Sequence, residues 1–191
     1  MRYLLVATLL FAPTACGKPQ QPAENGPASA EAPAPEARSG VDRSQKGKPA
    51  PEATFSDPEG GEISLADFRG TPVLVNLWAT WCAPCVKELP TLDRLARSHR
   101  VDGQLGVVAV SQDMGPQPSV EAYLAKLKVS DLGAYHDPKM ALSGALGAEV
   151  LPTSILYDAE GREIWRYVGD LDWTGEEAAR LLSEAGGGAK G

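Results

Sequence analysis

Two cysteines three positions apart, Cys82 and Cys85, are the residues of this chain best suited to covalent chemistry. The run from Val73 to Trp78 ahead of them is almost wholly apolar, as in a strand that is buried on both faces. Apolar residues after them recur at helical spacing, at Val86, Leu89, Leu92, Leu95 and Ala96. The sequence therefore predicts that the cysteine pair lies on the first turn of a helix that follows a central strand.

The start of a helix favours thiol chemistry. Its first backbone N–H groups have no partner within the helix and its dipole is positive there, so both stabilise a thiolate. We expect Cys82, next to Trp81, to be the exposed nucleophile and Cys85, one turn further on, to be the buried resolving thiol. Pro84 fits an early helical turn, where its missing N–H does little harm. The predicted chemistry is exchange between this pair of thiols and a disulfide.

The other elements must place this pair. A short hairpin and a helical turn are predicted before the central strand, and an alternation of strands and helices follows it. A hairpin around Asp158-Ala159-Glu160-Gly161 and a terminal helix close the chain. The predicted ranges are strands 53–55, 62–65, 105–111, 153–157 and 163–167, a turn at 66–70, and helices 120–127, 140–146 and 173–185. This order predicts an α/β domain with a mixed sheet that helices cover on both faces.

The net charge of −7 and the lack of a basic cluster with interleaved aromatic residues argue against a nucleic-acid partner. The chain of 191 residues has three cysteines, too few for a disulfide scaffold. Two thiolates alone could hold Cu(I) or half a zinc site, so a metal-binding module is one alternative function. No further cysteine or suitably spaced histidine completes four ligands, and we therefore predict no metal site.

The stretch from Asn76 to Pro90, NLWATWCAPCVKELP, closely resembles the redox motif of thioredoxin-fold proteins. It resembles more narrowly the TlpA/ResA group of bacterial, membrane-tethered thiol–disulfide oxidoreductases, and the resemblance extends from about Pro49 to Leu182. A CxxC alone also occurs in zinc half-sites, so the flanking residues carry the match. The resemblance implies a thioredoxin-like fold with an N-terminal hairpin extension and an enzyme without a cofactor. A thiol peroxidase-like redoxin is the other alternative, because the hairpin region also resembles redoxins.

The same resemblance assigns a role to Leu151-Pro152-Thr153, which precedes a predicted strand. In thioredoxin-like proteins the proline at this place is cis and packs beside the cysteines, and the backbone of the residue before it meets an extended substrate segment. An ordinary trans proline at the start of a strand is the alternative. The predicted substrate-binding residues are Trp81, Ala83, Pro84, Leu151, Pro152 and Thr153.

Glu88 is the candidate proton acceptor. Thioredoxin has a buried Asp where this chain has Asn76, and a neutral amide cannot act as a base. The TlpA/ResA pattern has a Glu at the position of Glu88, one helical turn after Cys85. A half-buried carboxylate there would have a raised pKa and could accept the Cys85 proton. The alternative is a solvated acid of the first turn that the helix dipole favours. We interpret Trp173 as a packing residue.

The first 48 residues contain predicted export signals. Residues 1–15 have the length of a signal peptide, with an apolar run too short to span a bilayer comfortably. Small residues precede Cys16, as at a lipoprotein cleavage site, although Pro13 stands where that pattern has an aliphatic residue. An uncleaved signal anchor and ordinary secretion are the alternatives. Residues 16–48 are rich in Pro, Ala and Glu and lack apolar periodicity, so we predict a disordered tether there. The predicted domain follows at 49–185, and the predicted flexible tail at 186–191.

The resemblance also implies a location and partners. We expect a periplasmic or otherwise extracytoplasmic monomer, attached to a bacterial membrane by a lipid on Cys16. Its substrate is expected to be a protein disulfide, which it reduces, often during cytochrome c or oxidase maturation in this group. A membrane thiol–disulfide reductant of the DsbD/CcdA kind would then reduce the Cys82–Cys85 disulfide again. The residues themselves leave the direction of the reaction open.

Overall fold

The computed structural model describes residues 40–189. The predicted signal peptide at 1–15, the predicted lipid site at Cys16, the tether up to residue 39 and the last two residues of the tail lie outside the described residues. No helix between residues 40 and 189 is both long enough and apolar enough to cross a membrane.

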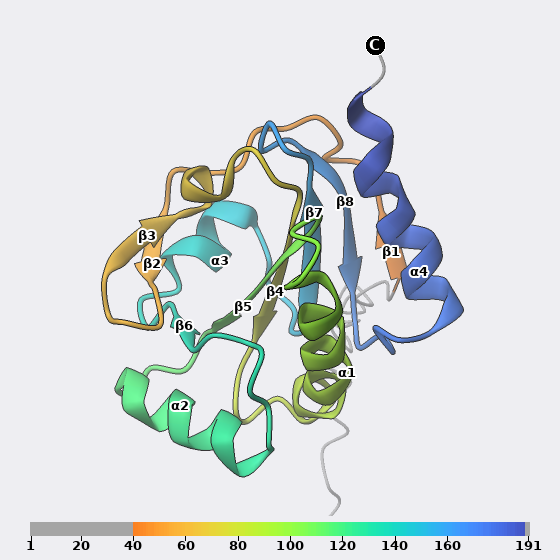
Figure 1. Cartoon of the computed structure of the whole chain (residues 1–191). Coiled ribbons are helices and arrows are strands. Elements are labelled where there is room, and N and C mark those ends of the chain that lie inside the picture. Colours follow the sequence, from red (N-terminus) through yellow and green to blue (C-terminus); the bar gives the residue numbers. More distant parts are fainter. Residues whose placement is uncertain (1–39, 190–191) are drawn as a thin grey trace, which may run out of the picture. The chain divides into compact units, whose positions relative to one another are not determined.

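The described residues form one mixed sheet with the strand order β1-β8-β7-β4-β5-β6-β2-β3 (Figure 1). β4 lies inside it, parallel to β5 and antiparallel to β7. The strands are β1 (Gly40–Asp42), β2 (Thr54–Ser56), β3 (Glu62–Ser64), β4 (Val73–Trp78), β5 (Gly106–Ser111), β6 (Tyr135–His136), β7 (Thr153–Tyr157) and β8 (Glu163–Val168). The prediction of an α/β domain with a mixed sheet and an early hairpin, here β2–β3, is confirmed.

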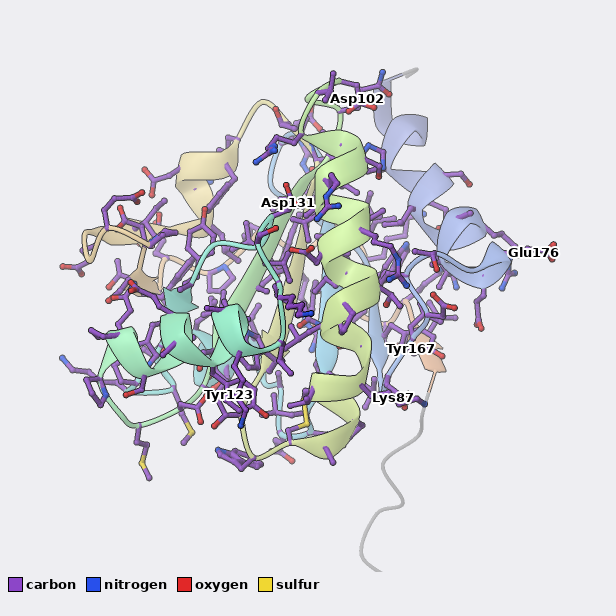
Figure 2. The ribbon with its side chains drawn as sticks, turned by 60° about the horizontal axis from the view of Figure 1, so that its bottom comes forward. Lys87, Asp102, Tyr123, Asp131, Tyr167 and Glu176 are labelled. Atoms are coloured by element: carbon purple, nitrogen blue, oxygen red, sulfur yellow. A yellow bond between two sulfur atoms is a disulfide. The ribbon has the colours of Figure 1, made fainter. Side chains whose placement is uncertain are left out.

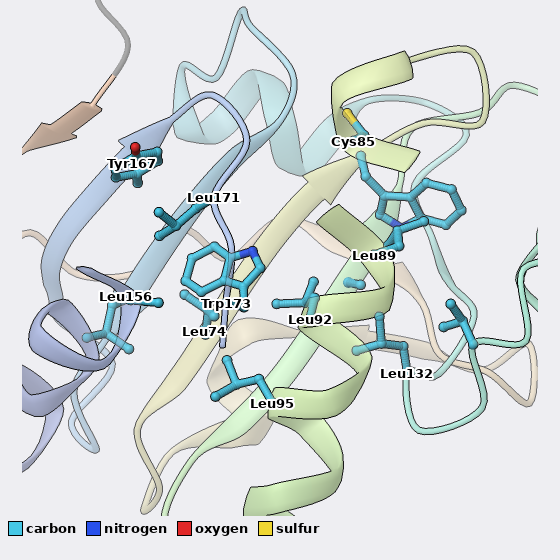
Figure 3. Packing of buried hydrophobic residues seen from close by; sticks show 14 of the residues in the cluster. Leu74, Cys85, Leu89, Leu92, Leu95, Leu132, Leu156, Tyr167, Leu171 and Trp173 are labelled. Carbon is cyan, nitrogen blue, oxygen red and sulfur yellow. The ribbon is translucent and has the colours of Figure 1, made fainter. Parts of the chain in front are cut away.

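Helices cover both faces of the sheet, and the alternation of side chains along β4 explains why. Leu74 and Trp78 point into one cluster with α1, α2 and α4, whereas Val75 and Leu77 point into a second cluster with α3. Figure 3 shows Leu74, Leu92 and Trp173 meeting where α1 covers the sheet. The helices are α1 (Ala83–His99), α2 (Gln117–Lys126), α3 (Ala141–Leu146) and α4 (Glu176–Leu182), with 3-10 helices η1 (Leu65–Phe68) and η2 (Ser183–Ala189).

The folded domain begins earlier than the predicted boundary at residue 49. β1 pairs with β8, with Gly40 opposite Val168 and Asp42 opposite Arg166. The chain then stays beside the β7–β8 hairpin, where Gly47 N donates to Glu163 O at 2.7 Å. Backbone pairing at a sheet edge requires no apolar pattern, so the composition of residues 40–48 did not indicate it. The predicted tether is therefore too long at its C-terminal end.

The terminal helix also differs from the predicted range of 173–185. α4 begins only at Glu176, because residues before it are held in other ways: Trp173 N donates to Thr91 Oγ1 and Thr174 N donates to Asp172 Oδ1. A 3-10 helix then extends the chain from Ser183 to Ala189, into the range predicted as a tail.

Candidate active site

The cysteine pair lies at the start of α1, and the two cysteines form a disulfide with Cα atoms 5.3 Å apart. Cys82 is the N-cap residue rather than a member of the first turn, and its Sγ accepts a bond from Cys85 N at 3.3 Å. Cys82 is 6% exposed and Cys85 0%. Cys82 is thus less exposed than predicted in this disulfide form, although it remains the more accessible of the two.

The exposed side of the pair is formed by neighbouring residues. Trp81 is 69% exposed, and Ala83 and Pro84 are exposed as well. In Figure 2 the yellow bond of the disulfide lies at the same end of α1 as Lys87, far from Asp102. Two hydrogen bonds hold the preceding loop, because Thr80 donates to Asp113 through its backbone N at 3.0 Å and through Oγ1 at 2.7 Å. No motif in the sequence indicates this role of Asp113.

The segment Leu151-Pro152-Thr153 lies at the same end of the sheet. The Leu151–Pro152 peptide bond is cis, as the resemblance implied. Thr153 pairs with Leu77 near the end of β4, and Pro152 O accepts a bond from Gly169 N at 2.9 Å. Pro152 and Thr153 are buried, and Thr153 Oγ1 donates to Val150 O at 2.6 Å, so Leu151 is the residue of the three with a partly exposed side chain.

Glu88 lies one turn after Cys85 on α1 and is only 2% exposed, so it is not a solvated acid of the first turn. Burial raises the pKa of its carboxyl group from 4.5 to about 7, because the charged form loses its hydration. Hydrogen bonds from Leu171 N, Asn76 and Trp173 act in the opposite direction and lower that pKa, while the charge of Asp170 raises it further. A carboxyl group whose pKa is held near 7 by these opposing effects can both take up and release a proton near neutral pH.

The two oxygens of Glu88 have different partners. Oε2 accepts from Leu171 N at 3.0 Å and from Trp173 Nε1 at 3.1 Å. Oε1 accepts from Asn76 Nδ2 at 2.7 Å, and the same Nδ2 donates to Ser154 Oγ at 2.9 Å. Two N–H donors occupy the lone pairs of Oε2, whereas Oε1 accepts a single bond among the described residues, so Oε1 is the oxygen with room for a proton. Asn76 is therefore linked directly to the candidate base.

Sequence reasoning missed three of these contacts. Trp173 packs in the core as predicted, but its hydrogen bond to Glu88 was not predicted, nor were the bonds of Leu171 and Ser154. Trp173 and Leu171 lie 85 and 83 positions from Glu88 in the chain, and Ser154 lies 78 positions from Asn76. No local spacing rule joins residues so far apart, and only the folded sheet brings them together. Among residues 40–189, no group of three or more His, Cys, Asp or Glu side chains is placed to hold a metal ion.

Comparison with known proteins agrees with this arrangement. The family model described as redoxin matches residues 45–182. The thiol–disulfide oxidoreductase ResA of Bacillus thuringiensis (strain Al Hakam) is 32% identical over 131 residues, which cover 68% of this chain and 73% of the relative. The family match spans the central strand, the cysteine pair and the cis-proline segment.

Solved structures show the same fold. A protein from Chlorobium tepidum assigned as the thiol:disulfide interchange protein DsbE superposes with a TM-score of 0.64 and 26% identity, over 73% of this chain and 96% of that one. The pneumococcal exposed lipoprotein thioredoxin from Streptococcus pneumoniae superposes with a TM-score of 0.59 and 22% identity, over 69% of this chain and 97% of that one. The thioredoxin-like fold is thereby confirmed. This chain belongs to the redoxin family and, within it, is a ResA-like thiol–disulfide oxidoreductase with Cys82 and Cys85 as its CxxC pair.

Proposed function

We propose that this oxidoreductase reduces protein disulfides outside the cytoplasm and that Glu88 is the base of its resolving step. The observation that carries the proposal is a buried carboxyl group with a pKa of about 7, one helical turn from the buried Cys85. A group with a pKa near the working pH is well matched to moving a proton to and from a thiol. The resemblance to the TlpA/ResA group supports reduction as the direction.

The proposed reaction has two exchanges. The Cys82 thiolate attacks one sulfur of the substrate disulfide, which forms a mixed disulfide and releases the other substrate sulfur as a thiolate. Cys85 then gives its proton to Glu88 Oε1, and its thiolate attacks Cys82 Sγ. The second substrate sulfur leaves as a thiolate, so the substrate has gained two electrons and the Cys82–Cys85 disulfide has formed.

Asn76 can change its hydrogen bond to Glu88 when Glu88 takes up a proton. Its Oδ1 is buried and has no hydrogen-bond partner among the described residues, while its Nδ2 donates to Glu88 Oε1. Rotation of the amide would present Oδ1 to a protonated Oε1. The Ser154 hydroxyl suits either orientation, because a hydroxyl both donates and accepts.

The proposed partners follow from this reaction. The Cys82–Cys85 disulfide requires two electrons from a thiol donor before the next cycle. A membrane reductant of the DsbD/CcdA kind is the donor that the TlpA/ResA resemblance supports. The same resemblance supports cytochrome c or oxidase maturation as the setting, and hence a client segment whose cysteines must be reduced before a haem or a metal is attached.

Trapping the mixed disulfide tests the proposed substrate class. Cys85→Ser removes the resolving thiol, so Cys82 should remain bound to its client. The probe is a synthetic peptide with the sequence pattern C-x-x-C-H, the attachment motif of c-type haem, closed by an internal disulfide. We expect a covalent adduct on Cys82 by non-reducing mass spectrometry, which dithiothreitol removes.

Cys82→Ser is the matched control for this trap. It retains Cys85, which is 0% exposed, and should therefore form little adduct. Adduct formation on Cys85 at the same rate would reverse the order of the two thiols. No adduct in the Cys85→Ser protein would refute the reduction of such peptides.

We also propose that a lipid on Cys16 attaches the protein to a membrane. Thr14 and Ala15 give the small residues that precede a lipoprotein cysteine. The intact mass of the protein from the native membrane fraction should equal a chain that begins at Cys16 and carries acyl groups. An unmodified chain from the soluble fraction, beginning at or after Gly17, would contradict this prediction.

A further inference from the structure

The segment that joins β8 to α4, residues 169–175, lies against the start of α1, where two of its hydrogen bonds go to one carboxyl group. Leu171 N and Trp173 Nε1 both donate to Glu88 Oε2, and Trp173 N donates to Thr91 Oγ1 at 3.2 Å. Figure 3 shows the indole of Trp173 between Leu171 and Leu92, with its nitrogen turned toward α1. The indole is buried, so its position is fixed by packing.

This hydrogen bond differs from that of Trp165, another buried indole in the same cluster. Trp165 Nε1 donates to a neutral backbone carbonyl, Leu181 O, at 3.1 Å. Trp173 Nε1 donates to a carboxyl group, and a bond to an ionised acceptor is about twice as strong as one between neutral groups. An indole N–H cannot accept a proton, so it favours the carboxylate over the carboxylic acid at Oε2.

We propose that Trp173 is a positioning residue for the Glu88 base. Its indole N–H holds Oε2 as the unprotonated oxygen, so that the proton is exchanged at Oε1 beside Asn76, and it opposes the tendency of burial to neutralise Glu88. This inference rests on the proposed function, because it gives a partner to the base of that reaction. It extends the site to the segment between β8 and α4, which no spacing in the sequence indicated.

The other charges near Glu88 are few among the described residues. Asp170, on the same segment, raises the pKa of Glu88, and it forms an ion pair with Lys87 at 2.7 Å. Burial raises the pKa of the hydroxyl group of Tyr167 on β8, and the charge of Glu88 raises it further, so this group is uncharged at neutral pH. Cys85 does not titrate in the disulfide form. Titration of the oxidised protein therefore isolates Glu88.

The wild-type protein provides a test that requires no core mutation. In ¹H–¹⁵N spectra of the oxidised full chain, the Trp173 indole signal should shift with a midpoint near pH 7, because its acceptor changes charge. The Trp165 indole signal should stay constant over the same range. Glu88→Gln should abolish the shift. A Trp173 signal that does not titrate, or that titrates equally in Glu88→Gln, would refute the inference.

Trp173→Phe tests the effect on the base, because it removes the N–H donor and keeps an aromatic ring. The pKa of Glu88, followed by carboxyl ¹³C shifts in the oxidised protein, should rise by about one to two units. Trp165→Phe removes an indole N–H elsewhere and should leave it unchanged. An unchanged Glu88 pKa in Trp173→Phe, or an equal rise in Trp165→Phe, would overturn the inference.

The rate of disulfide exchange separates this inference from the proposed function. If Glu88 is the base, the midpoint of the pH profile of the exchange rate in Trp173→Phe should shift to higher pH by the same amount as the ¹³C midpoint. A moved ¹³C midpoint with an unmoved rate profile would keep Trp173 as the partner of Glu88. That result would remove Glu88 from the reaction.

Discussion

Glu88→Gln should slow disulfide exchange by about 10²–10⁴-fold at neutral pH, the usual contribution of a positioned acid–base group. The buried thiol of Cys85 would lose the carboxylate that takes its proton, and Asn76 cannot replace it. Gln has nearly the shape and helix propensity of Glu, so α1 should remain intact. Stopped-flow reduction of a peptide disulfide measures the effect, and the limb of the pH profile near pH 7 should also disappear.

Asp170→Asn is the control for this measurement. Asp170 lies on the segment next to Glu88 and raises the pKa of that group, but it is ion-paired with Lys87 toward solvent. Removing its charge should change the exchange rate only slightly and lower the midpoint of the pH profile. Equal rates for wild type and Glu88→Gln, with the same pH profile, would mean that the Cys85 proton leaves by another route.

The second large effect concerns stability. The pKa of Glu88 is about 7 in the folded protein and 4.5 in an unfolded chain, so the folded state binds more protons between these values. The contribution of Glu88 to the free energy of unfolding should therefore be fully present below pH 4.5 and should be lost as the pH rises through 7. At 1.36 kcal/mol per unit, the raised pKa corresponds to a loss of about 3 kcal/mol.

Glu88→Gln should lack this loss, because Gln does not ionise. Urea unfolding of the oxidised wild type and Glu88→Gln, between pH 4 and pH 8, measures the difference in pH dependence rather than in absolute stability. The carboxyl groups with lowered pKa values, such as Asp67 and Asp131, do not interfere, because they titrate below this window in both proteins. Parallel curves for the two proteins would show that burial does not raise the Glu88 pKa.

The parts of the fold that the sequence predicts well are those with a strong local pattern. The apolar run at 73–78 becomes the buried strand β4, and the helical spacing after Cys85 becomes α1. β1 was not predicted because this short edge strand is held by backbone bonds to β8 and its Val41 is exposed. The start of α4 was misplaced because contacts with α1 hold Trp173 outside the helix.

The candidate site likewise has a part that local spacing predicts and a part that it does not. Cys82, Cys85 and Glu88 follow one another on one helix, so their spacing alone relates them. The partners of Glu88 come from β4 and the segment after β8, and β7 contributes only Ser154, which bonds to Asn76. The fold rather than the spacing sets those contacts. The extent of burial at Glu88 could not be predicted either, since it depends on the segment that covers it. The cis form of Pro152 was anticipated only through the family resemblance.

The pairing of β1 with β8 has a consequence for how the chain reaches its native state. Gly40 and Val168, the first and last residues in these two strands, are direct partners although the whole sheet lies between them in sequence. Contacts of such high sequence separation are slow to form, because the entropy of closing the loop is lost before they can contribute. The sheet is complete only when the C-terminal hairpin has been synthesised, so the final topology of the oxidoreductase has to be acquired after translation of nearly the entire domain.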